Sequence, residues 1–330
     1  MMIALFILGG LIALAAGGEL LVRGAVQLAE RIGVSPLLIS LTLVGLGTST
    51  PEIVTSVQAA LIGSPGIAVG NIVGSNIVNI LLILGVSALI KPIVVSSLAL
   101  RRDGVLVAAT AVLFAAMSWL WTLDRAVGLV FITGLIVYIA YALRQERAGA
   151  DGRTAAFERA EAFEAIHTGT HLHSTQSAKA RTTSFVLSLG SALVGLVLVV
   201  VGGRFLVDGA IGIARILEIS ESVIGLTIVA VGTSAPEMVT SITAALRRQS
   251  DVALGNVLGS NIYNILAIGG LTALIAPTDV PLDIVRFDNI VMVAVSAAFL
   301  IFAWTGSRIG RKEGAVLVIG YGAYLLAEWW

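Results

Sequence analysis

The sequence contains no cysteine and has few charged residues. The lack of cysteine excludes disulfide bonds, thiolate zinc sites and a cysteine nucleophile. Charged residues make up 12% of the 330, about half the roughly 25% of an ordinary soluble domain, and this shortage excludes a soluble enzyme. Because 20 basic residues balance 20 acidic ones, the composition gives no sign of nucleic-acid binding.

Hydrophobic residues dominate instead. They make up 57% of the chain, and the mean hydropathy is +1.00. The apolar runs are about 20 residues long, enough to cross a hydrocarbon core of roughly 30 Å. The composition therefore predicts an all-α membrane protein with several spans. The first run has no basic residues before it, so we interpret it as a retained span and not as a secretory signal.

An internal repeat organises the chain. Residues 41–92 align without a gap onto residues 226–277 at a constant offset of 185, and about 30 of these 52 positions are identical. The first copy contains GTSTPEIVTS and GNIVGSNIVNIL, and the second contains GTSAPEMVTS and GNVLGSNIYNIL. We interpret the chain as two related halves, 1–143 and 185–330, joined by a polar linker at 144–184.

Each half contains five apolar runs, and an odd number of spans places the second copy upside down in the bilayer. The predicted fold is therefore ten transmembrane helices arranged as two inverted five-helix repeats. The predicted spans are 2–22, 37–61, 67–90, 104–123 and 126–143, then 185–207, 222–246, 252–276, 288–305 and 315–330.

The placement of basic residues predicts the orientation. With the N-terminus outside, 16 of the 20 basic residues fall in inner connections, as the positive-inside rule prefers. We therefore expect both termini outside and a cytoplasmic linker, in a bacterial inner membrane. The three histidines, His167, His171 and His173, lie in this linker. Two interpretations remain open for them, a solvated loop and a regulatory metal site.

Helices 2 and 7 are predicted to break, because Pro51 and Pro236 cannot donate a backbone hydrogen bond to the preceding turn. Carbonyl groups freed at such a break must face protein or a wet cavity, where they can bind a cation. Glu52 and Glu237 follow directly, about halfway along their spans. A carboxylate at that depth costs at least about 2.5–3.5 kcal/mol, more than the roughly 0.3–1 kcal/mol that helix capping returns. A ligand role is therefore favoured over capping alone.

The third span of each half adds neutral oxygens. Ser75 and Asn79 are four residues apart and share a helix face, and Ser260 and Asn264 are their equivalents. Carboxylates, hydroxyls and amides together form an all-oxygen set, which suits hard cations such as Ca²⁺ and Na⁺. Two ionised glutamates would neutralise one Ca²⁺ or serve several Na⁺. Since no span contains a histidine that could activate a serine, we expect a protein that is not an enzyme.

The two motif pairs resemble the alpha-repeats of the cation/calcium exchanger superfamily, and in particular those of prokaryotic sodium/calcium antiporters. This resemblance implies alternating access to a cluster at the membrane midplane that binds Na⁺ and Ca²⁺ competitively. Some relatives carry aspartate where this chain has Asn264. In this chain the two equivalent positions, Asn79 and Asn264, are both neutral. The resemblance implies these ligands: the carboxylates of Glu52 and Glu237, the hydroxyls of Thr48, Ser49, Thr233 and Ser234, the carbonyls of Gly45 and Ala230, and the side chains of Ser75, Asn79, Ser260 and Asn264.

The expected function is therefore antiport of Na⁺ against Ca²⁺, with export of Ca²⁺ and with the first and sixth spans sliding past the rest. The alternative is a proton-coupled antiporter of Ca²⁺ or another divalent cation that uses the same glutamates. The expected partners are Na⁺, Ca²⁺ and the lipid bilayer. We expect no cofactor, no nucleic acid and no obligatory protein partner.

Overall fold

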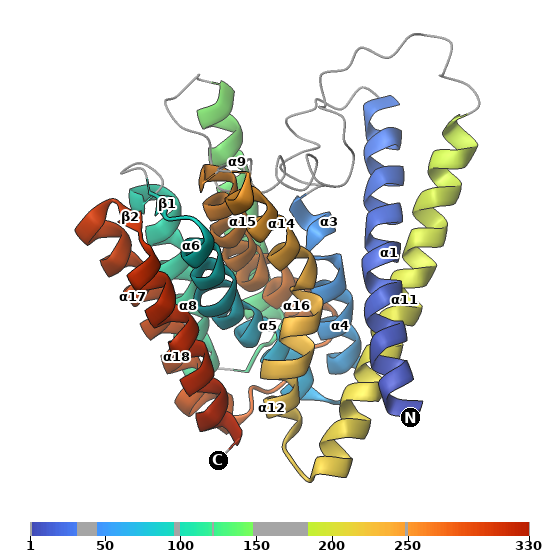
Figure 1. Cartoon of the computed structure of the whole chain (residues 1–330). Helices are drawn as coiled ribbons and strands as arrows, with labels where there is room; N and C mark the ends of the chain where they lie inside the picture. The colour runs from blue at the N-terminus through green and yellow to red at the C-terminus, as the bar shows by residue number, and fades with distance from the viewer. Residues whose placement is uncertain are drawn as a thin grey trace.

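The computed structural model describes residues 2–31, 45–95, 100–120, 122–147, 184–247 and 250–329, and these residues are mostly helical (Figure 1). Within this part of the chain, six helices are long and apolar enough to cross a membrane, and one pair bent by 50° makes a seventh. The predicted spans 37–61, 104–123 and 315–330 do not reach that standard, although most of their described residues are helical.

Each half supplies nearly the same succession of elements, and corresponding elements begin 182 to 186 residues apart; η marks a turn of π-helix. The first half contains α1 (Met2–Arg31), α3 (Gly45–Thr48), α4 (Thr50–Leu61), α5 (Pro65–Val78), η2 (Asn79–Leu84), α6 (Gly85–Ile90), β1 (Ile93–Val94), η3 (Leu100–Gly104), α8 (Val105–Leu120) and α9 (Arg125–Arg147). The second half contains α11 (Ser184–Leu217), α12 (Glu221–Ile224), η5 (Gly225–Val229), α13 (Ala230–Thr233), α14 (Ala235–Leu246), α15 (Ser250–Tyr263), η6 (Asn264–Gly269), α16 (Gly270–Ile275), η7 (Ile284–Asp288), α17 (Asn289–Gly306), β2 (Arg308–Ile309) and α18 (Arg311–Trp329).

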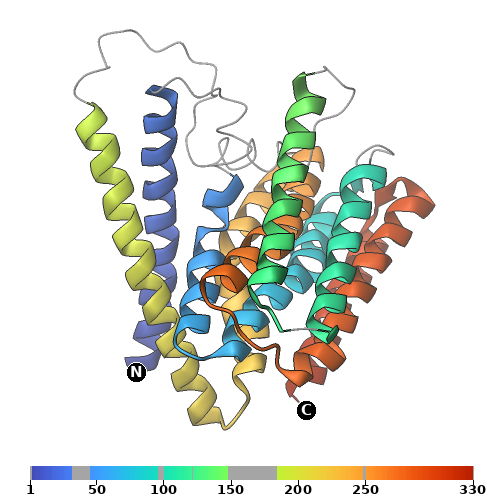
Figure 2. The same cartoon turned by 180° about the vertical axis from the view of Figure 1, so that it is seen from behind.

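Helices α1 and α11 pack side by side in opposite directions (Figures 1 and 2). A methyl group added to Gly17 would lie 2.9 Å from the carbonyl oxygen of Gly195, and one added to Gly10 would lie 2.8 Å from that of Gly202. The two backbones therefore touch where side chains are missing, as is common between membrane helices. Helices α1 and α11 hold equivalent places in the two halves and run in opposite directions.

Both helices continue past the predicted ends of their spans, to Arg31 and Leu217 in place of residues 22 and 207. The prediction ended each span near its first charges. Charges end a stretch that can lie in lipid, but they do not end a helix when they pair along it. Such pairing is present in the ion pair of Glu19 with Arg23.

The helices that carry the repeated asparagine motif form the centre of the molecule. In the most apolar 18 residues of each of the continuous helices 65–90 and 252–275, 83% are buried, compared with 28% in the corresponding stretch of α11. The outer helices instead expose large apolar side chains, such as Trp304 of α17 and Ile319 of α18. This distribution fits a bundle whose outer surface faces lipid.

Short extended segments join the two halves. Strand β1 pairs antiparallel with β2, with Ile93 opposite Ile309, and a single bridge joins Leu123 to Thr278. The start of α1 and the end of α18 lie at one end of the molecule, whereas α9 ends and α11 begins at the other (Figures 1 and 2).

Candidate cation site

The two glutamate-bearing helices begin at equivalent bends. Between α3 and α4, Ser49 has φ −89° and ψ 8°, and between α13 and α14, Ser234 has φ −83° and ψ 8°. Pro51 and Pro236 stand in the first turn that follows, where the missing N–H group costs least. The backbone carbonyl of Ala230 still accepts a hydrogen bond from the amide of Ser234 at 3.1 Å. The pair α13 and α14 is therefore bent at Ser234 but keeps this hydrogen bond across the bend.

Both glutamates are buried in the first turn of the helix that follows the bend. Glu52 of α4 is 1% exposed, and Glu237 of α14 is 4% exposed. The hydroxyl of Ser234 donates to Oε1 of Glu52 at 3.4 Å, although the two residues are 182 positions apart. A hydroxyl of the second half thus meets the carboxylate of the first half at the bends of both.

Asn79 and Asn264 each begin a π-helical turn in the middle of a continuous helix. Such turns occur frequently at functional sites, because they widen the helix and redirect the side chains beside them. Nδ2 of Asn79 donates to Oδ1 of Asn261, on the equivalent helix of the other half, at 2.9 Å. The sequence pattern indicated neither the π-turns nor this amide pair.

Several of the expected ligand oxygens have no hydrogen-bond partner among the described residues. They are Oγ of Ser75, Oγ of Ser260 and Oδ1 of Asn79, and all three are buried. A buried polar atom without a partner destabilises a fold by about 1–3 kcal/mol. A cation bound between these oxygens would satisfy them, so the residues present fit a cation site.

The remaining expected ligands fall into two groups. Thr233 and Asn264 are buried, and Ala230 lies one turn before the bend. Gly45 and Thr48 belong to α3, but their burial lies outside what the structure describes. The histidines of the linker, residues 167, 171 and 173, also lie outside them.

Within the described part of the chain, no three histidine, aspartate or glutamate side chains converge in a way that could hold a metal ion. A cation held between the two glutamates would therefore depend on neutral oxygens for the rest of its coordination. This is compatible with Ca²⁺ and Na⁺, which accept hydroxyl, amide and carbonyl ligands.

Two further buried acids, Asp103 and Asp288, were missed by the sequence analysis although they are 185 positions apart. Asp103 pairs with Arg102 at 2.9 Å, and Asp288 accepts a hydrogen bond from Tyr324 at 2.7 Å. The repeat offset could have found them. Both have protein partners at the start of α8 and α17, so they are not part of the candidate site.

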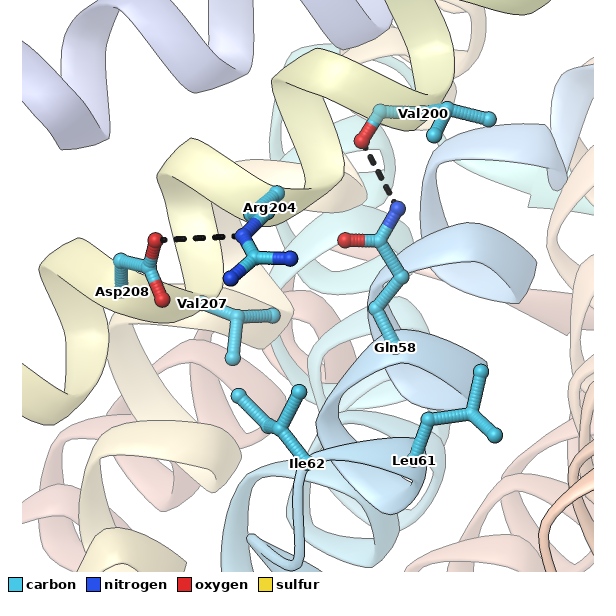
Figure 3. Close-up of a pocket in the computed structure, with 7 residues that line it drawn as sticks. All are labelled: Gln58, Leu61, Ile62, Val200, Arg204, Val207 and Asp208. Carbon is cyan, nitrogen blue, oxygen red and sulfur yellow. Dashed lines mark hydrogen bonds and ion pairs between the residues drawn. The ribbon is translucent and has the colours of Figure 1, made fainter.

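A cavity of about 270 Å³ lies between α4 and α11 (Figure 3). Gln58 donates from Nε2 to the backbone oxygen of Val200 across it at 2.7 Å, and Arg204 pairs with Asp208 at 3.8 Å. None of its lining residues is an expected ligand, so this cavity is separate from the candidate site. The lining consists of Gln58, Leu61, Ile62, Val200, Arg204, Val207 and Asp208.

A bundle of apolar helices around buried, oxygen-rich bends defines an integral membrane transporter. The family model of the sodium/calcium exchanger protein matches residues 2–144 and 187–330, and the chain therefore belongs to this family. It is 35% identical to the sodium/calcium exchanger MaX1 of Methanosarcina acetivorans, covering 98% of this chain and 97% of that protein. It is 34% identical to the inner membrane protein YrbG of Escherichia coli, over 97% of this chain and 95% of that one.

A solved structure has the same fold. The sodium-calcium exchanger NCX_Mj, soaked with 10 mM Na⁺ and zero Ca²⁺, superposes with a TM-score of 0.61 and 31% identity over 98% of both chains. These comparisons confirm the family that the repeated motifs indicated. Relatives named in this way are transporters and not enzymes, and the family and the fold support cation/calcium antiport.

Proposed function

We propose that this protein exchanges Na⁺ for Ca²⁺ across a bacterial inner membrane and exports Ca²⁺. The observation that carries the proposal is the contact between Glu52 and Ser234, which come from different halves. Among the other proposed ligands, Ser75 and Ser260 hold buried oxygens that lack a hydrogen-bond partner among the described residues. Two carboxylates with neutral oxygens match the charge of one Ca²⁺ and also accommodate Na⁺.

The proposed architecture is ten spanning helices in two inverted five-helix repeats, with helices 2 and 7 broken. It is supported by the matching succession of elements in the two halves and by the opposite directions of α1 and α11. The bends at Ser49 and Ser234 correspond to the two breaks. The N-terminus and C-terminus face outside in this arrangement, and the linker 144–184 is cytoplasmic, which places most basic residues inside.

The proposed binding site lies at the midplane and takes ligands from both halves. Glu52 and Glu237 supply the negative charge, and the other ligands supply neutral oxygens. These are the hydroxyls of Thr48, Ser49, Thr233 and Ser234, the carbonyls of Gly45 and Ala230, and the side chains of Ser75, Asn79, Ser260 and Asn264.

Exchange follows from competition for this one cluster. Na⁺ that enters from outside displaces Ca²⁺ taken from inside, so each crossing carries one load or the other. The empty site crosses poorly, because two uncompensated carboxylates would have to pass a lipid-lined barrier. Sliding of α1 and α11 past the central helices would open the site to each side in turn.

The proposal is tested with purified protein in vesicles loaded with Na⁺. Uptake of ⁴⁵Ca²⁺ is followed after external Na⁺ is removed, beside vesicles that carry only a pH gradient. We expect uptake that requires the Na⁺ gradient. Uptake driven by pH alone would assign the protein to proton-coupled antiport, and uptake under neither gradient would show that Ca²⁺ is not the cargo.

A further inference from the structure

A buried asparagine ties the central helix α5 to the helix that carries Glu52. Nδ2 of Asn71 donates to the backbone oxygen of Glu52 at 3.3 Å and to Oγ of Ser56 at 2.9 Å. An amide nitrogen has two hydrogens, so both are engaged and the orientation of the amide is fixed. Asn71 is completely buried. The first turn of α4 is therefore held in one position against α5.

The second half repeats this arrangement. Asn256 of α15 donates to the backbone oxygen of Glu237 at 3.1 Å and to Oγ of Ser241 at 2.8 Å. All three residues stand 185 positions after their counterparts in the first half. Because the same two bonds occur at both glutamates, the arrangement is a property of the repeat and not an accident of local packing.

The oxygen of Asn71 makes a contact to the other half. Thr233 of α13 donates from its hydroxyl to Oδ1 of Asn71 at 3.0 Å, and the backbone oxygen of Val229 is an alternative acceptor at 3.0 Å. A hydroxyl has one hydrogen and two acceptor lone pairs. With its hydrogen directed to either protein oxygen, Thr233 offers a cation only lone pairs.

We propose that Asn71 and Asn256 are positioning residues for the cation site, and that Asn71 also couples Glu52 to Thr233 across the two halves. This inference rests on the proposed function. Neither amide donates to a glutamate carboxylate in the bonds described here; each holds the backbone from which a carboxylate projects. Groups that orient metal ligands in this way typically change metal affinity by roughly 10–100-fold when they are removed.

The test is equilibrium binding of ⁴⁵Ca²⁺ to the purified full-length protein in detergent, together with the melting temperature of each variant without Ca²⁺. We expect Asn71→Ala and Asn256→Ala each to raise the Ca²⁺ concentration for half-maximal binding by roughly tenfold. The matched control is Asn76→Ala. Asn76 is also a buried asparagine of α5, but it donates to the backbone of Ile72 in its own helix at 2.8 Å, so binding should stay near that of the unaltered protein.

The coupling is tested by combining each change with Thr233→Ala. We expect the effect of Asn71→Ala to shrink when Thr233 is already altered, because residues in one hydrogen-bond network are not additive. The effect of Asn256→Ala should persist in full, since Asn256 makes its bonds within its own half. Equal additivity for both asparagines would overturn the coupling.

If the two asparagines are merely structural, Asn71→Ala and Asn256→Ala will lower the melting temperature but bind Ca²⁺ as Asn76→Ala does. That result would overturn the inference. If Asn71→Ala does not fold, Asn256→Ala decides the positioning role alone. Binding in detergent needs no gradient. A failure of the Na⁺-dependent uptake would therefore refute the proposed coupling ion without affecting this measurement.

Discussion

Glu52 and Glu237 concentrate the negative charge of the candidate site. Each is buried in the first turn after a bend, where the N-terminus of a half-helix favours a carboxylate by about 0.3–1 kcal/mol. That contribution is smaller than the penalty for burying a charge in a membrane. The proposed bound cation would account for the retained charge, and the hydroxyl of Ser234 contributes a dipole beside Glu52.

The first prediction therefore concerns the glutamates. Glu52→Gln and Glu237→Gln keep the size of the side chain but remove one of two negative charges, so we expect Na⁺-dependent ⁴⁵Ca²⁺ uptake to fall by at least roughly 100-fold, the scale of a lost buried charge contact. The matched control is Glu218→Gln, an exposed residue in the turn after α11, which should transport normally. Full transport by Glu52→Gln would remove this carboxylate from the site.

At the scale of elements, the contact between α1 and α11 depends on glycines that recur every seven residues. Gly10, Gly17 and Gly24 on α1 meet the backbone of α11, and Gly195 and Gly202 on α11 meet that of α1. At these positions the backbone of one helix lies against the backbone of the other. We infer that the two helices move as one unit relative to the central bundle.

Gly17→Ala tests this pairing. The added methyl would lie 2.8 Å from the backbone nitrogen of Val199, and overpacking of this kind costs about 1–3 kcal/mol. We expect the maximal exchange rate to fall by roughly an order of magnitude, with the Ca²⁺ concentration for half-maximal uptake unchanged, because the proposed ligands lie on other helices. Gly9→Ala on the same helix meets nothing within 4 Å and serves as the control. Equal rates for the two variants would contradict the prediction.

At the scale of the whole molecule, the direction of each helix decides which residues lie at the same end of the bundle. Helix α11 ends at the same end of the molecule as the start of α1, and α18 begins at the opposite end (Figure 1). Exposed positions at these two helix ends are Glu218, which directly follows α11, and Lys312, in the first turn of α18. The proposed orientation places Glu218 outside and Lys312 inside.

The lack of native cysteine makes the orientation directly measurable. In intact cells, a membrane-impermeant thiol reagent should label the single-cysteine variant Glu218→Cys and should leave Lys312→Cys unlabelled until the membrane is opened. We expect this labelling pattern because basic residues are retained preferentially on the inner side of the membrane. The reverse labelling pattern would show that the protein is inserted the other way.

The sequence by itself determined the membrane class, the duplication and the family, and it predicted the residue types of the candidate site. Hydropathy shows which segments can lie in lipid. Within such a segment, Pro51 removes a backbone hydrogen bond and Glu52 adds a charge, and both are unfavourable in a membrane unless they serve a function. The offset of 185 then indicated the second copy of each feature. These conclusions need only local chemistry and self-comparison.

Only the tertiary structure decided which oxygens meet. The contact of Ser234 with Glu52 and the pair of Asn79 with Asn261 each join residues 182 positions apart in the sequence. No local sequence pattern predicts which residues so far apart will meet. The hydrogen bonds of Asn71 were equally hidden, because an asparagine in an apolar helix could pack or bond anywhere. The π-turns at Asn79 and Asn264 likewise arise within continuous apolar runs, since helix packing and not the hydrophobic pattern selects where an extra residue enters a turn.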